Sequence, residues 1–451
     1  MAAKWSCERL KDNTLPATRS PSSVSSGASD QAESVPQLVD HLFRHKAGQM
    51  ISALTRYFGV ENLGLVEDII QEALLKALQG WPYHGIPENP GGWLWQTAKH
   101  HALDVLRREA RFQKRLQGEI QLFEMQQVTA GQDVDSYPFE DDQLSMMFLG
   151  CHPALSREVQ IAFVLNTVSG FSAAEIARAF LISEATMAQR LVRAKARLRA
   201  AGARFGLPES GSLTERLNVV LDVLYLLFNE GYEAHAGERL LREELCLEAI
   251  HLCKLVVTHP MGQSPRVHAL LALMYLQAAR LTARIDAGGD LILLPAQDRS
   301  LWNREMIREG LTYLELSAAG DTLSEFHLQA AIAAKHAVAE TFDQTDWVGI
   351  LDDYAALLEI APSPVVKLNH AVAIAMIHGP QAGLQALFKL KDEASLKKYH
   401  LFYATFGELY ERSGNVQQAN QSYREALALT ENEAESRFLQ KKLRQIDGHD
   451  R

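Results

Sequence analysis

The stretch from Phe171 to Arg199 (FSAAEIARAFLISEATMAQRLVRAKARLR) constrains the fold most, because it predicts two short helices joined by a tight turn. Ser172 is a good N-cap, and Glu175 three residues later completes a capping box. Ser183 can cap the second helix. One apolar face of that helix, which we expect to be buried, consists of Met187, Leu191, Ala194 and Leu198.

The opposite face of the second helix is polar and basic. It offers Thr186, Gln189, Arg190, Arg193 and Arg197, with Lys195 to one side. A helix that packs on one side and presents Gln and Arg on the other is suited to the major groove of DNA. An ordinary amphipathic hairpin with a solvated basic face is the alternative. The coincidence of caps, turn length, core spacing and basic face favours a helix-turn-helix.

The composition describes a protein of two or three domains without a membrane span. In 451 residues, 47% are hydrophobic and 22% charged, and no apolar run approaches the roughly 20 residues that span a bilayer. Residues 1–34 are rich in Ser and Ala, which predicts a disordered tail rather than a signal peptide. We expect a cytoplasmic protein.

The four cysteines predict neither a disulfide framework nor a metal site. They are Cys7, Cys151, Cys246 and Cys253. Cys246, His251 and Cys253 are close in sequence but lie in an apolar helical pattern, so we interpret them as core residues. We expect no metal and no cofactor.

The net charge of −10 is unevenly distributed. Residues 35–206 hold 18 basic and 18 acidic side chains, whereas residues 207–451 hold 23 Lys and Arg against 33 Asp and Glu. The acidity of the chain therefore does not argue against nucleic-acid binding by its first half.

Two helices are predicted before the first Gly-rich segment, over residues 36–58 and 63–78. The second has a broad apolar face and a polar side that carries Glu67, Asp68, Gln71 and Glu72. The clustered carboxylates could hold a metal, but no His lies at ligand spacing. An acidic patch that meets a basic partner is the preferred interpretation.

A loop is predicted over residues 80–92 (GWPYHGIPENPGG), followed by a helix over residues 93–106. A basic strip comes next, with Arg107, Arg108, Arg111, Lys114 and Arg115. Aromatic side chains beside such a strip suit melted DNA, because bases stack on rings while cations hold phosphates. For Trp93, a place in the core and a stacking role are equally compatible with the sequence.

An acidic segment separates these helices from the helix-turn-helix. No Lys or Arg occurs between Arg115 and Arg157, and seven acidic residues fall in that gap. We expect a flexible linker over residues 118–140, a helix from Asp141 to Cys151, and another within residues 153–168 for which Ser156 is the N-cap.

The chain from residue 213 to 451 reads as helices joined by short turns. Eight positions fit the spacing of a tetratricopeptide repeat: Tyr403, Phe406, Gly407, Tyr410, Gly414, Ala419, Tyr423 and Ala426. Gly379 lies 35 residues before Gly414, and Thr345 lies 34 before Gly379. We therefore expect three helical pairs between about residues 331 and 430, in a solenoid with a concave face for a partner.

These segments resemble an extracytoplasmic-function (ECF) sigma factor of bacterial RNA polymerase. VEDIIQEALLKAL is similar to the segment that grips the polymerase clamp, which implies polymerase-binding roles for Glu67, Asp68, Gln71 and Glu72. NPGGWLWQTAKHHALDVLRR resembles the segment that opens the minus-ten promoter element. This resemblance implies that five residues lie near DNA: Trp93, His100, Asp104, Arg107 and Arg108. It also implies that the loop from Trp81 to Pro90 forms a pocket for a flipped base.

LSREVQIAFVLNTVSGFSAAEIARAFLISEATMAQRLVRAKARLR is similar to the family's minus-thirty-five-binding domain. The resemblance implies minus-thirty-five contacts by Thr186, Gln189, Arg190, Arg193 and Arg197. It further implies that the acidic linker threads the polymerase's RNA channel. The partners would be RNA polymerase core and promoter DNA, with no membrane.

The C-terminal half resembles the extension of one subgroup of these sigma factors, through LYLLFNEGYEAHAG, QDRSLWNREMIREG, LQAAIAAKHA and PSPVVKLNHAVAIA. In that subgroup the extension is thought to take over regulation in place of a separate anti-sigma protein. Residues 207–451 carry ten more acidic than basic side chains (33 against 23), which could let this half dock on the basic recognition helix and mask it. The NEGY and QDR sequences and the Asp346–Trp347 pair suggest a ligand site; polar caps and solenoid core are the preferred alternative.

The expected fold is all-α: sigma domains over residues 35–117 and 141–206, joined by the acidic linker and followed by a tetratricopeptide-like solenoid over residues 213–451. No Walker sequence, nucleophile elbow or HExxH occurs, so we expect no enzyme. A one-component regulator that binds duplex DNA and senses a partner is the second hypothesis, and an adaptor scaffold is the third.

Overall fold

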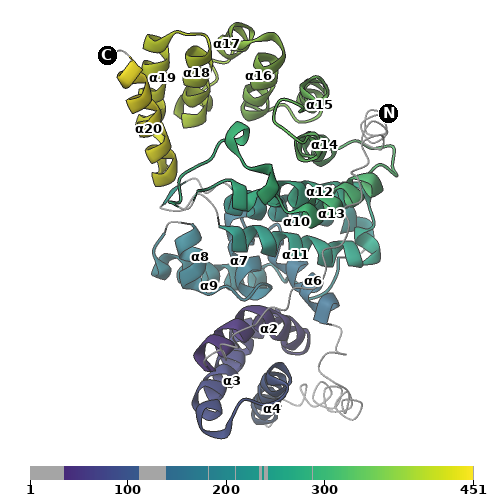
Figure 1. The fold of residues 1–451 in the computed structure, drawn as a ribbon. Helices are drawn as coiled ribbons and strands as arrows, with labels where there is room; N and C mark the ends of the chain where they lie inside the picture. Colours follow the sequence, from purple (N-terminus) through teal and green to yellow (C-terminus); the bar gives the residue numbers. More distant parts are fainter. Residues whose placement is uncertain are drawn as a thin grey trace, which may run out of the picture. The chain divides into compact units, whose positions relative to one another are not determined.

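The computed structural model (Figure 1) describes residues 35–449, except residues 111–138, 181, 209, 233–235, 238–241 and 287. The described residues divide into two compact units, the first ending at Leu224 and the second beginning at Tyr225. The predicted tail over residues 1–34, and residues 118–138 of the predicted linker, lie outside the described residues.

The first unit begins with a group of three α-helices and one short 3-10 helix. They are α2 (Val35–Phe58), η1 (Val60–Asn62), α3 (Leu63–His84) and α4 (Pro90–Ala110). The helix α2 packs against both α3 and α4, and the predicted apolar face of α3 is buried throughout. These contacts leave the opposite side of α3 exposed.

Four shorter helices follow in the first unit: α6 (Phe139–Gly150), α7 (Arg157–Thr167), α8 (Ala173–Ala179) and α9 (Glu184–Ala200). The predicted capping box is confirmed, since Ser172 Oγ accepts from the Glu175 N–H (3.2 Å) and the Ser172 N–H donates to Glu175 Oε2 (2.9 Å). Ser183 Oγ likewise accepts from the Thr186 N–H (3.2 Å). Ser156 occupies the N-cap position of α7, without a side-chain cap bond.

The prediction of a loop over residues 80–92 is wrong at both ends. The helix α3 continues through Pro82 to His84 and ends at Gly85 with φ 83°, while α4 already begins at Pro90. Proline near the end of a helix removes few backbone bonds, and proline at the first position of a helix removes none. Trp81 stabilises the extra turn of α3, because the residue is 97% buried and its ring centre lies 5.5 Å from that of Trp93.

The helix α10 (Ser210–Tyr232) crosses from the first unit into the second. The second unit then contains α11 (Glu243–Thr258), α12 (Pro265–Ala278), α13 (Arg304–Ser317), α14 (Glu325–Val338), α15 (Trp347–Ile360), α16 (Pro364–His378), α17 (Pro380–Phe388), α18 (His400–Arg412), α19 (Val416–Leu429) and α20 (Glu433–His449). Its short 3-10 helices are η3 (Pro260–Gly262), η4 (Leu281–Ala283), η5 (Leu294–Ala296), η6 (Arg299–Leu301) and η7 (Leu396–Lys398).

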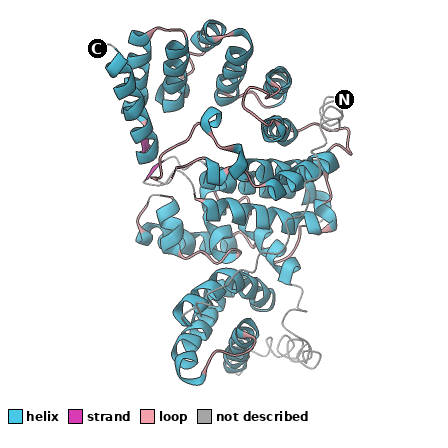
Figure 2. Cartoon of the chain, in the orientation of Figure 1, coloured by secondary structure: helices cyan, strands magenta, loops and turns pink. Residues whose placement is uncertain are grey.

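The predicted all-α fold is confirmed (Figure 2). Within the described residues, strand structure is limited to β1 (Ala236–Gly237) and β2 (Glu431–Asn432), a short parallel pair, and one isolated bridge. From α14 to α20 each helix packs against the next one in sequence (Figure 1). No helix among the described residues is long and apolar enough to cross a membrane.

Candidate nucleic-acid interface

The helix α9 separates a buried face from a polar face as its sequence predicts. Met187, Leu191, Ala194 and Leu198 are all at least 95% buried. Thr186, Gln189, Arg193 and Arg197 are exposed, and Arg190 is half-buried with Nη1 3.6 Å from Glu158 Oε2. The structure therefore brings the five predicted minus-thirty-five residues onto one accessible side of one helix.

A third side of α9 contacts η1 and the first turns of α3. Lys195 Nζ donates to Glu67 Oε2 in an ion pair, and Arg199 Nη2 donates to the carbonyl oxygen of Glu61 (2.8 Å). At about 100° per residue, Lys195 points roughly 180° away from the centre of the polar face. The contact with α3 consequently leaves the predicted DNA-facing side of α9 open.

The four predicted polymerase-binding residues do not share one environment. Asp68, Gln71 and Glu72 are exposed on α3, and Glu72 Oε2 lies 3.2 Å from His101 Nε2 of α4. Glu67 instead is paired with Lys195, and its side chain is only 19% exposed. Burial raises the pKa of the Glu67 carboxyl above its ordinary value, although Lys195 acts to lower it.

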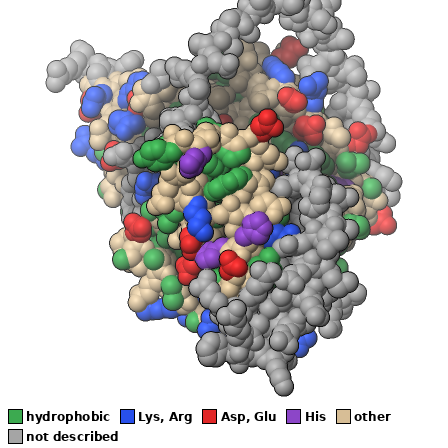
Figure 3. Space-filling model, turned by 90° about the horizontal axis from the view of Figure 1, so that it is seen from below, with side chains coloured by type: hydrophobic (Ala, Val, Ile, Leu, Met, Phe, Trp, Pro, Cys, Tyr) green, Lys and Arg blue, Asp and Glu red, His purple; other side chains and the backbone are tan. Residues whose placement is uncertain are grey.

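Two leucines belong to the exposed side of α3 and were not predicted as part of it. Leu75 and Leu78 are 54% and 38% exposed, one and two turns beyond Gln71. Tyr83 and Ile86 extend the apolar surface (86% and 42% exposed). Figure 3 shows the molecule from below the view of Figure 1, and on that face hydrophobic side chains lie beside histidines and charged groups. Leucines off the apolar stripe of a helix were the available sequence signal.

The helix α4 carries all the predicted minus-ten residues. Trp93 is half-buried against Trp81, while His100 and Asp104 are exposed. Arg107 and Arg108 belong to the helix, but their side chains lie outside the described part. Trp95 is 95% buried and is a core residue.

The predicted pocket for a flipped base needs correction. Trp81 to His84 are helical and Trp81 is buried, so the loop available beside α4 is only Gly85 to Asn89. Asn89 Oδ1 accepts from the Gly92 N–H (2.8 Å), which caps the start of α4. Any base-binding surface here is shorter than the sequence indicated.

Comparison with known proteins identifies this arrangement. Family models of sigma-70 region 2 and sigma-70 region 4 match residues 42–112 and 145–198. The chain is also 39% identical over 397 residues to an uncharacterized protein of Rhizobium meliloti (strain 1021). The matched stretch covers 88% of this chain and 92% of that relative. The chain belongs to the sigma-70 family. A family of unknown function (DUF6596) matches residues 216–318 of this sigma factor.

The two sigma-70 regions assign this sigma factor to transcription initiation, with RNA polymerase core and promoter DNA as partners. Region 2 comprises most of α2 to α4, and region 4 includes the helix-turn-helix of α8 and α9. Sigma-70 proteins are transcription factors without catalytic activity. Among the described residues, no group of three metal-ligating side chains occurs.

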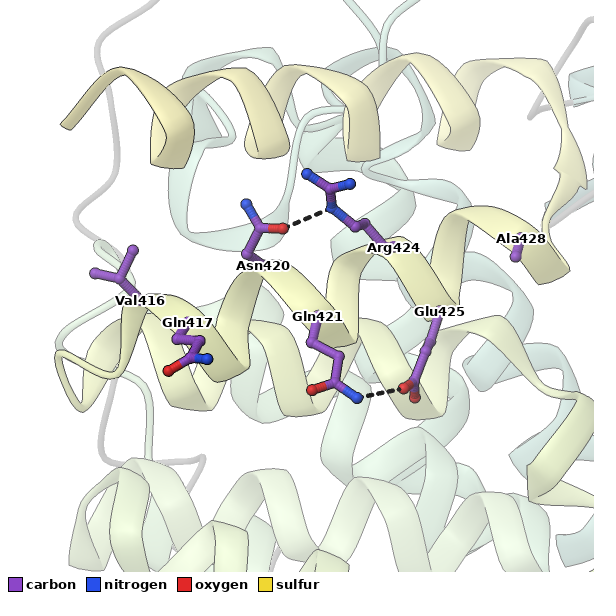
Figure 4. Close-up of a pocket in the computed structure, with 7 residues that line it drawn as sticks. All are labelled: Val416, Gln417, Asn420, Gln421, Arg424, Glu425 and Ala428. Carbon is purple, nitrogen blue, oxygen red and sulfur yellow. Dashed lines mark hydrogen bonds between the residues drawn. The ribbon is translucent and has the colours of Figure 1, made fainter. Parts of the chain in front are cut away.

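Among the described residues of the second unit, one surface hollow on α19 differs in character from another between α18 and α20. One lies along the outside of α19 (Figure 4), where Asn420 bonds to Arg424 (2.7 Å) and Gln421 to Glu425 (3.1 Å), as on a solvated helix face. The other, with a volume of about 240 Å³, lies mainly between α18 and α20 and is mostly apolar. Because the polar groups of the first bond to each other, it offers little for a ligand.

Proposed function

We propose that the chain is a sigma factor of the ECF subgroup, acting in the cytoplasm where promoter DNA and polymerase core are found. The observation that carries the proposal is the pair of sigma-70 region matches, 2 and 4, in one helical unit. The proposed domain limits are residues 35–117 and 141–206, with residues 213–451 as an added C-terminal extension.

The proposed polymerase surface is the exposed side of α3. Asp68, Gln71 and Glu72 supply charge and polarity there, and Leu75 and Leu78 supply apolar area. Exposed leucines beside carboxylates suit a partner surface that is both basic and apolar. Glu67 joins this surface only if its pair with Lys195 opens.

The proposed promoter surfaces are on α4 and α9. On α4, Trp93, His100, Asp104, Arg107 and Arg108 recur at helical spacing, so a melted strand would meet one continuous face. On α9, Gln189 would contact base edges while Arg190, Arg193 and Arg197 contact phosphates.

The proposed role of the second unit is regulation through a tetratricopeptide-like solenoid. Sequential packing from α14 to α20 supports a repeat architecture. So does the close approach of α18 and α19: a Cβ on Gly407 would lie 2.6 Å from the ring of Tyr423. We include in this proposal an intramolecular contact in which the acidic extension masks the basic helix α9.

The affinity of the purified full chain for core RNA polymerase tests the proposal. A sigma factor binds core polymerase in the absence of DNA. A one-component regulator binds duplex DNA but not core polymerase, and that result would reject the proposal. An adaptor scaffold binds neither, which would reject it as well.

A further inference from the structure

Three arginines of the second unit gather around aromatic rings. The guanidinium carbons of Arg284 and Arg280 lie 3.9 Å and 5.5 Å from the ring centre of Tyr232. That of Arg299 lies 4.6 Å from the ring of Trp302. Aromatic faces attract guanidinium groups, but they do not neutralise the charge.

Backbone contacts hold these arginines in one region. The Asn303 N–H donates to the carbonyl oxygen of Ala279 (2.7 Å), and Thr282 Oγ1 donates to that of Leu301 (3.1 Å). The segment after α12 therefore lies against η6, where Arg299 is the first residue. Burial lowers the pKa of Arg299, and the positive charge of Arg280 lowers it further.

His336 of α14 adjoins the same charges. Arg299 Nη1 donates to the carbonyl oxygens of His336 (2.6 Å) and Ala339 (2.7 Å). Burial, followed by Arg280 and Arg299, lowers the pKa of His336 to about 3. The imidazole is consequently neutral at physiological pH, and its ring packs edge-on against Trp347 at 5.2 Å.

Within the part of the chain that the structure describes, the positive charge of this cluster has no carboxylate partner. Among the residues that the structure describes, no ion pair involves Arg280, Arg284 or Arg299. Carboxylates on neighbouring residues bond elsewhere: Glu230 pairs with Arg242, Asp353 pairs with Lys335, and Asp298 accepts from the Ser300 N–H. Arg284 is buried and Arg280 and Arg299 are half-buried, and charges withdrawn from water are normally paired in proteins.

Several side chains of this cluster bury a polar atom that has no hydrogen-bond partner among the described residues. These atoms are Tyr232 Oη, Arg299 Nη2, Trp302 Nε1 and His336 Nδ1. Tyr232 and Trp302 are 91% and 97% buried. Such groups are nearly always satisfied in folded proteins, so several in one cluster indicate an absent acceptor.

We propose that this cluster binds a small molecule through its carboxylate or phosphate group, with Arg280 and Arg299 as the charged donors. Guanidinium groups bind both anions through paired N–H donors. The NEGY and QDR sequences thus contribute Tyr232 and Arg299 to one site, with Trp347 at its edge, whereas Asp346 caps α15 through the Gly349 N–H (2.9 Å). The cluster can bind an anion whether or not the second unit regulates the sigma domains. An effect of the bound anion on transcription, however, rests on the proposed regulatory function.

The test uses the purified full chain and two probes, inorganic phosphate and acetate. Each is titrated against sodium chloride at constant ionic strength, and tryptophan fluorescence is recorded because Trp302 and Trp347 lie in the cluster. We expect a saturable change with at least one probe and none with chloride. A preference for phosphate or for acetate then separates the two ligand chemistries.

Two variants make the test specific. Arg280→Gln should weaken anion binding at least tenfold, because it removes a donor whose only hydrogen bond in the described structure is to Gln277 (3.1 Å). Arg308→Gln carries the same charge change on the exposed side of α13 and should bind as the unmodified chain does. Without anion, Arg280→Gln should unfold at the same or a higher temperature, since one of several repelling charges is gone.

Three results would overturn the site: no saturable change with either probe, equal anion binding by Arg280→Gln, or a marked fall in its unfolding temperature, which would make Arg280 structural. An anion that binds but leaves promoter-directed transcription unchanged supports the site and argues against regulation through it. The failure of the site and that of the proposed function are therefore distinguishable.

Discussion

Glu67 of α3 and Lys195 of α9 form an ion pair that joins sigma-70 region 2 to region 4. Both side chains are less than one-fifth exposed, and Glu67 Oε1 has no partner among the described residues. The pair occupies a residue of the proposed polymerase surface while leaving the polar face of α9 free. Core polymerase and Lys195 would thus compete for one carboxylate.

Replacing Lys195 with Met should destabilise the first unit in a pH-dependent way. Burial raises the pKa of Glu67 and Lys195 lowers it, so the pKa rises further without Lys195. An acid whose folded pKa exceeds its unfolded value stabilises the fold less as pH rises through that window. We expect a loss of about 1–3 kcal/mol in unfolding free energy near pH 8, shrinking near pH 5.

Urea unfolding of the full chain at both pH values measures this effect. The double variant Glu67→Gln, Lys195→Met is the control, because its stability no longer includes the titration of residue 67. An equal loss at pH 8 and pH 5 for the single variant would show that the pair does not govern this part of the stability.

Asp68→Ala should weaken binding to core polymerase by about tenfold, the loss of one interfacial charge contact of roughly 1.4 kcal/mol. Asp68 is exposed, so the fold should be unaffected. Glu88→Ala, in the loop before α4, removes the same charge outside the proposed surface. Fluorescence anisotropy with labelled chain measures both affinities, and an unchanged affinity for the Asp68 variant would remove α3 from the interface as we place it.

Arg193→Ala should weaken promoter binding without reducing affinity for core polymerase. If Arg193 contacts a phosphate, the slope of log affinity against log salt should also fall by about one. Arg424→Ala on α19 removes the same charge from the second unit and should leave the slope unchanged. Titrations of promoter DNA at several salt concentrations decide the matter; a normal affinity and slope for Arg193→Ala would argue against DNA contact by this face.

A chain shortened after α10 should bind promoter DNA more tightly at low salt if the acidic extension masks α9. The cut belongs after Tyr232, since Arg216 Nη2 donates to the carbonyl oxygen of Phe148 (2.6 Å) and Asp222 pairs with Arg157 (3.0 Å) within the first unit. The increase should vanish at high salt, where charge attraction is screened. Unchanged or weaker binding at low salt would contradict masking.

Local sequence signals predicted the helix-turn-helix well, because its determinants are close in the chain. Ser172, Glu175 and Ser183 act within three or four residues, and the buried face of α9 follows from helical spacing alone. The same local logic failed at Pro82, where density in Gly and Pro suggested a loop. The buried contact of Trp81 with Trp93 outweighs that signal, and it depends on two helices.

Long-range contacts were beyond prediction from one sequence. Glu67 and Lys195 are 128 residues apart, and each also fits an exposed charged face. Similarly, Arg280, Arg299 and His336 come from three separate elements, so nothing local indicates that their charges meet. The NEGY and QDR sequences were noticed as unusual, but their shared cluster required the fold.

Reconstituted transcription tests the central claim most directly. Core RNA polymerase is mixed with the full chain on DNA fragments of the host genome, and transcript 5′ ends are mapped. A sigma factor predicts new start sites that appear only with the chain and share upstream elements at minus ten and minus thirty-five. The same transcripts with and without the chain would contradict the account.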